Sequence, residues 1–105
     1  MNDFKEAHND AKRFETVCIQ ASQCLCVGPC VLCCVVISPE DATGVYECKI
    51  YDGQDESGVL KFDIEGQFIP FEVTDSHGYY FRNGLYVALT TNIGNVTMHF
   101  DPIRD

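Results

Sequence analysis

The amino-acid sequence predicts an all-β protein, a small antiparallel, jelly-roll-like β-sandwich of about eight strands. Short runs rich in β-branched and aromatic residues alternate with turn signals roughly every 8–12 residues, which is typical of sandwiches and barrels. A hydrophobic content of 46% in 105 residues indicates one packed domain rather than a disordered chain. We expect an N-terminal arm or short helix over residues 1–15 and a sandwich domain over residues 16–105.

Residues 1–15 are the part of the chain with helical spacing. Phe4 and Phe14, with two alanines between them, recur at helical intervals, and Asp3 with Glu6 forms a capping-box pattern. The alternative is an extended arm in which Phe4 and Phe14 contact a neighbouring subunit. Because charges alternate here without an apolar stretch, we expect no secretory signal.

The next segment, residues 16–39, runs for 24 residues without a charged side chain and holds six of the seven cysteines. Gly28-Pro29 is a turn pair, so the sequence predicts two strands, 16–27 and 30–38, apolar on both faces and inside the sandwich. The length also suits a membrane span, but the turn and the polar residues 20, 22 and 23 argue against a helix in lipid. We therefore expect no membrane partner.

The remaining strands are expected at residues 45–51, 59–64, 67–74, 79–82, 85–91 and 96–100. The loop from Asp52-Gly53 to Ser57-Gly58 makes the first two a hairpin. Pro70 makes 67–74 an edge or bulged strand, and residues 75–78 indicate a turn. Asn83-Gly84 is a strong hairpin signal, and alternation predicts that Val96, Met98 and Phe100 point inward.

The cysteines allow three interpretations, of which burial as reduced packing residues is preferred, because free cysteine behaves as a small hydrophobe. Disulfides across the Gly28-Pro29 turn and a metal or redox role stay open, although no second metal-binding knuckle or adjacent histidine supports the latter. The residues concerned are Cys18, Cys24, Cys26, Cys30, Cys33, Cys34 and Cys48.

The other candidate sites are weak. The acidic loop 52–56 lacks an EF-hand pattern, and neither His77 nor His99 has a nucleophile at a recognisable spacing. We therefore predict no catalytic residue, no metal ligand and no cofactor. Tyr79, Tyr80 and Tyr86 surround one hairpin and form a candidate sugar-stacking or protein-docking face, the alternative being ordinary core and surface positions.

The charge distribution excludes one class of partner. The formal net charge is −9, without the lysine and arginine clusters that phosphate backbones require, so we expect no nucleic acid. Such acidity fits solubility, or a surface that meets a basic or neutral partner.

Three segments together carry a family resemblance: GPCVLCCVVI at residues 28–37, IYDG at 50–53 with SG at 57–58, and FRNGLYV at 81–87 leading to VT at 96–97. This order resembles small virion proteins of tailed bacteriophages, which pair a YDG…SG hairpin with a late F-x-x-GLYV…VT hairpin. The likeness covers about residues 24–101. The density of cysteines departs from the family pattern.

The resemblance implies a non-enzymatic structural subunit, a capsid decoration (cement) protein or a minor head or tail component. It implies the major capsid protein or another virion protein as partner, a homo-oligomer with a trimer favoured, and location in the virion after synthesis in the host cytoplasm. Two alternatives remain: a carbohydrate- or receptor-binding module and a cysteine-ligated metal protein.

Overall fold

The computed structural model describes residues 15–41, 43–67 and 71–103. The predicted N-terminal arm or helix, with Phe4 and Phe14, lies outside the described residues. Within them the chain forms strands, turns and bends but no helix.

In the described residues, eight strands follow one another. They are β1 (Glu15–Ile19), β2 (Gln23–Cys26), β3 (Cys30–Pro39), β4 (Val45–Asp52), β5 (Val59–Gln67), β6 (Phe71–Phe81), β7 (Leu85–Thr91) and β8 (Ile93–Pro102).

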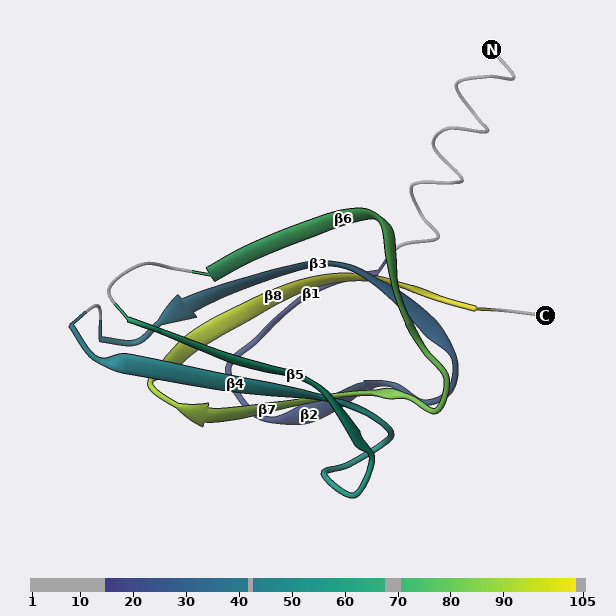
Figure 1. The fold of residues 1–105 in the computed structure, drawn as a ribbon, viewed down its shortest axis with the longest axis horizontal. Helices are drawn as coiled ribbons and strands as arrows, with labels where there is room; N and C mark the ends of the chain where they lie inside the picture. Colours follow the sequence, from purple (N-terminus) through teal and green to yellow (C-terminus); the bar gives the residue numbers. More distant parts are fainter. Residues whose placement is uncertain (1–14, 42, 68–70, 104–105) are drawn as a thin grey trace, which may run out of the picture.

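The strands form two antiparallel four-stranded sheets that face each other (Figure 1). One sheet has the order β1-β8-β3-β6 and the other β2-β7-β4-β5, so successive strands cross repeatedly between the sheets. This order is that of an eight-stranded jelly roll. The predicted fold class is therefore confirmed.

Alternating side chains from both sheets fill the space between them. In β4 every second residue is buried, and in β8 the buried positions are Val96, Met98 and Phe100, as predicted. Burial of this apolar surface supplies the main stabilising contribution to the fold. The largest fully buried side chains are Phe81, Leu32, Ile37, Ile50, Leu85 and Met98.

The uncharged run differs from its prediction in one respect. Residues 16–27 do not form one central strand, because the chain bends at residues 20–22 and continues in the other sheet. Both resulting strands, β1 and β2, lie at sheet edges, and only β3 is central. The prediction was wrong because an absence of charge does not require burial on both faces. The hydroxyl of Ser22 accepts the N–H of Leu89 at 2.8 Å and holds this crossing.

The turn predicted at residues 75–78 is also wrong, since the backbone there belongs to β6. The register pairs Leu32 with Tyr79 and Cys34 with Thr74, so one residue of β3 faces four of β6. The turn-forming residues therefore make a bulge, and Gly78 adopts a φ of 76° within it. As Pro70 indicated, the strand that follows it lies at a sheet edge.

Candidate functional site

A buried carboxylate joins two of the three segments that carry the family resemblance. Asp52, at the end of β4, is only 7% exposed and accepts the backbone N–H groups of Asn83 at 2.7 Å and Arg82 at 3.2 Å. Beside it, the N–H of Gly53 donates to the carbonyl of Gly84 at 3.2 Å. The YDG segment thus caps the turn between β6 and β7, and we call this contact the Asp52 clamp.

Glycines are required where these two motifs meet. Gly84 has a φ of 146°, and a Cβ there would lie 2.5 Å from the carbonyl oxygen of Gly53. A Cβ on Gly53 would lie 2.9 Å from the Cα of Gly58. These positions require glycine because the backbones of the two segments approach too closely for a Cβ atom. The two segments therefore form one structural unit.

The cysteines occupy three kinds of environment. Cys30 and Cys48 are buried, Cys18 on edge strand β1 is exposed, and Cys24 and Cys26 are half-buried, as are the two cysteines at positions 33 and 34. Burial raises the pKa of the Cys30 and Cys48 thiols to about 12. A thiol that stays protonated is a poor nucleophile and a poor metal ligand, so these two behave as core residues.

The thiols near the β2–β3 turn are held by local contacts. Cys24 Sγ donates to the carbonyl of Cys26 at 3.3 Å, and Cys26 Sγ to the carbonyl of Gly28 at 3.8 Å. Burial is also the main reason why the pKa of Cys26 is raised. In the part of the chain that the structure describes, no cysteine belongs to a cluster of three or more possible metal ligands, that is, one whose ligand atoms all lie within 4.8 Å of one another.

The structure places the three predicted interaction tyrosines on different surfaces. Tyr79 turns toward the core and packs edge-to-face on Phe62, with ring centroids 5.0 Å apart. Tyr80, its neighbour in β6, is 56% exposed. Tyr86 belongs to the other sheet. They do not share one binding face.

Tyr86 instead belongs to an apolar row that crosses the outer face of the β2-β7-β4-β5 sheet. Its ring lies 6.2 Å from that of Tyr51, its register partner in β4. Leu60 faces Tyr51 from β5, and Cys24 faces Tyr86 from β2. We call these four residues, two tyrosines flanked by a cysteine and a leucine, the aromatic row. The alternation of buried and partly exposed residues in β4 directs Tyr51 away from the core. Its neighbour Tyr86 follows only from the pairing of β4 with β7, which are far apart in the sequence.

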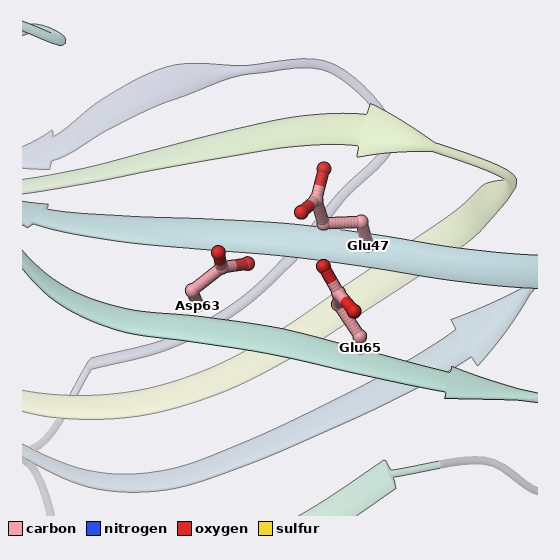
Figure 2. Close-up of side chains that lie close together, drawn as sticks. All are labelled: Glu47, Asp63 and Glu65. Atoms are coloured by element: carbon pink, nitrogen blue, oxygen red, sulfur yellow. The ribbon is translucent and has the colours of Figure 1, made fainter.

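Three carboxylates from β4 and β5 lie close together, as Figure 2 shows. Glu47 projects from β4, and Asp63 and Glu65 project from β5, with oxygens all within 4.8 Å of one another. Since Glu47, Lys49 and Tyr51 alternate with buried residues of β4, this acidic group and the aromatic row share one side of the sheet. The sequence predicted the β4–β5 hairpin but not its register, which shifts at a bulge between Ile50 and Tyr51, so the pairing of Glu47 with Glu65 was missed.

The carboxylates of the acidic group influence one another. A hydrogen bond with Glu47 and the negative charges of Glu47 and Asp63 raise the pKa of Glu65. The same bond with Glu65 and one from Thr90 lower the pKa of Glu47. Thr90 Oγ1 donates to Glu47 Oε1 at 3.1 Å. The strands thus hold like charges together, with Lys49 as the base between Glu47 and Tyr51 on β4.

A small apolar cavity lies between the sheets beside the bulge of β6. Its volume is about 50 Å³, and its lining includes Leu32, Val35, Ile50, Phe62, Ile64 and Tyr79. Ligand pockets are usually several hundred Å³, roughly 300–1,000, so this space is a packing gap rather than a binding site.

His99 has neighbours that its spacing did not reveal. Its Nδ1 lies 3.3 Å from Thr16 Oγ1, and its register partner in β3 is Cys34. The imidazole is exposed on the sheet surface, so water surrounds it. This arrangement gives no buried cradle for a substrate at His99.

The described fold is that of a jelly-roll sandwich protein. Comparison with protein-family models, with curated proteins and with solved structures finds no match to this chain. In the described part of the chain, no helix is long and apolar enough to cross a membrane.

Proposed function

We propose that this protein is a non-enzymatic virion structural protein of a tailed bacteriophage, and specifically a capsid decoration protein that stabilises the shell through subunit contacts. The observation that supports this most is the Asp52 clamp. Two of the three segments that resemble the phage proteins, 50–53 with 57–58 and 81–87, meet in space through backbone contacts. In these two segments the likeness therefore concerns one structural unit rather than separate short matches.

The fold is compatible with this role. Jelly rolls recur in viral capsid and lectin domains, although a fold alone does not specify a function. Four strands, β1, β2, β5 and β6, lie at sheet edges, where a neighbouring chain has backbone groups to pair with. An oligomer, with a trimer favoured, and synthesis in the host cytoplasm belong to the same proposal.

The test is the composition of purified virions. Quantitative mass spectrometry should find on the order of hundreds of copies per particle for a decoration protein on a symmetric shell, and about a dozen for a neck or tail component. Virions of a phage from which the gene is deleted should keep their shape but release their packaged genome more readily on heating. Absence of the protein from wild-type virions would overturn the proposal.

A carbohydrate-binding module is the second candidate, favoured by the paired rings of Tyr51 and Tyr86 on a jelly-roll surface. Aromatic side chains and carboxylates are groups that bind sugar faces and hydroxyls. Binding on a glycan array that disappears in Tyr51→Ala and Tyr86→Ala, but persists in Tyr80→Ala, would support it. An empty array with folded wild-type protein would remove it.

A further inference from the structure

We infer that the outer face of the β2-β7-β4-β5 sheet is the docking surface of this protein and that its occupant is a basic patch on a shell subunit. This inference rests on the proposed function and adds to it the surface used and the chemistry of the partner. The face consists of the aromatic row (Cys24, Tyr86, Tyr51, Leu60) and the acidic group (Glu47, Asp63, Glu65). Lys49, the register partner of Asp63, lies between them and offsets one of the three negative charges, which leaves an excess of acid.

The aromatic row supplies an apolar anchor. It runs across all four strands at one level of the sheet, since each member is the register partner of the next. Leu60 is 45% exposed, and Tyr51 and Tyr86 keep part of their rings in solvent. Tyrosine is enriched among the residues that dominate protein interfaces, because a large rigid ring and a hydroxyl are presented with little loss of conformational entropy.

The acidic group defines the charge of the partner. One oxygen from each of its three carboxylates lies within 4.8 Å of the others, and a hydrogen bond with Glu47 together with the negative charges of Glu47 and Asp63 raises the pKa of Glu65. A lysine or arginine from a partner would relieve that repulsion and form charge-assisted hydrogen bonds. The net charge of −9 adds long-range attraction toward a basic surface.

These features favour a protein partner over the other classes. A phosphate backbone or an anionic lipid would be repelled by the acidic group. A neutral glycan could stack on Tyr51 and Tyr86, but it would leave the repulsion among the carboxylates unrelieved. A basic protein surface with an apolar side chain satisfies both halves of the face.

The test measures binding of the purified protein to capsids from phage that lack its gene, by co-sedimentation at low and high salt. Two variants remove one half of the face each: Tyr51→Ala/Tyr86→Ala and Glu47→Gln/Asp63→Asn/Glu65→Gln. We expect the first to weaken binding by at least about tenfold, as loss of central interface aromatics does. We expect the second to slow association and to abolish most of the salt dependence.

Matched controls separate this face from general effects. Tyr80→Ala removes an exposed tyrosine from the other sheet, and Glu40→Gln/Glu56→Gln removes exposed charge from two loops. Both controls should bind as wild type does. The near-isosteric acid-to-amide variant keeps the test decisive if the tyrosine variant unfolds.

The outcomes distinguish the two levels of the proposal. If wild-type protein binds the capsids and both face variants bind equally well, the docking face is wrong while the virion role stands. If wild-type protein does not bind at all, both fail. Glycan binding that is lost in Tyr51→Ala/Tyr86→Ala while capsid binding is retained would overturn the inference in favour of a sugar site.

Discussion

The carboxylate of Asp52 accepts the backbone N–H of Asn83 across 2.7 Å and so ties the end of β4 to the turn between β6 and β7. Asp52 ends the first strand of the β4–β5 hairpin, whereas Asn83 lies in the turn between β6 and β7, which belong to different sheets. The hairpin predicted at Asn83-Gly84 is therefore wrong, because the chain crosses from one sheet to the other at this turn. A buried acceptor links the β4–β5 hairpin to that crossing. This relationship explains why the YDG and NGL segments occur together in one chain.

Replacing the clamp carboxylate should destabilise the fold. Asp52→Ala leaves two backbone N–H groups without their acceptor, and an unsatisfied buried group costs about 1–3 kcal/mol. Urea unfolding followed by tyrosine fluorescence would measure the loss. Asp55→Ala is the matched control, because Asp55 is exposed and bonds locally to Ser57, so we expect a loss below about 1 kcal/mol. Equal losses in both variants would contradict the role of the clamp.

Two glycines with positive φ should respond differently to alanine. At Gly84 a Cβ would meet the carbonyl of Gly53 at 2.5 Å, whereas at Gly28 nothing lies within 4 Å. Gly28→Ala should therefore cost only the backbone strain of about 1–2 kcal/mol. Gly84→Ala adds the clash and should cost more, with a lower yield of folded protein. The comparison of unfolding midpoints checks this, and a Gly28→Ala loss as large as that of Gly84→Ala would refute it.

Sequence reasoning reached the fold class and the strand count, but the count came from two compensating errors. The expected strand 16–27 is two strands, and the expected strands 67–74 and 79–82 are one. Alternation and turn pairs are local signals, so they located β4, β7 and β8 well. They do not say which sheet a strand joins, because that depends on partners far along the chain.

The neighbours of Tyr86 and of the acidic group could not be predicted for the same reason, because they depend on which strands pair and in which register. Tyr86 was recognised, but its expected neighbours lie elsewhere: Tyr79 faces the core, and Tyr80 is exposed on the other sheet, because β6 and β7 belong to different sheets. Its real neighbour, Tyr51, lies in β4, which pairs with β7 across a long separation in the sequence. The acidic group depends on the register of the predicted β4–β5 hairpin, in which a bulge between Ile50 and Tyr51 shifts the pairing and places Glu47 opposite Glu65.

The thiols should differ sharply in reactivity. With a pKa of about 12, only about one Cys30 or Cys48 thiol in ten thousand is ionised at about pH 8, and burial also blocks the reagent. Cys18 is exposed, so iodoacetamide should modify it first. Peptide mass spectrometry after timed alkylation, with and without denaturant, gives the order. Modification of Cys30 as fast as Cys18 in folded protein would show that the core opens at the β2–β3 turn.

The acidic group should leave a signature in the pH dependence of stability. Because the folded-state pKa of Glu65 is raised, its carboxyl holds its proton more tightly in the folded chain than in the unfolded one. Its contribution to stability is therefore full below the ordinary glutamate value of about 4.3 and is lost as the pH rises through the raised folded pKa. Glu65→Gln cannot ionise, so the variant should gain stability relative to wild type as the pH increases across this window.

Urea midpoints of wild type and Glu65→Gln at several pH values between about 3.5 and 7 measure this difference. Glu56→Gln, in the exposed β4–β5 loop, is the control for removing one negative charge elsewhere. The difference in urea midpoint between Glu65→Gln and wild type should increase with pH. It should shrink at high salt, because screening weakens repulsion between exposed charges. A difference that stays constant with pH, or a Glu65→Gln variant that loses stability at neutral pH, would mean that the three carboxylates do not repel one another. It would also remove the electrostatic reason for a basic partner on this face.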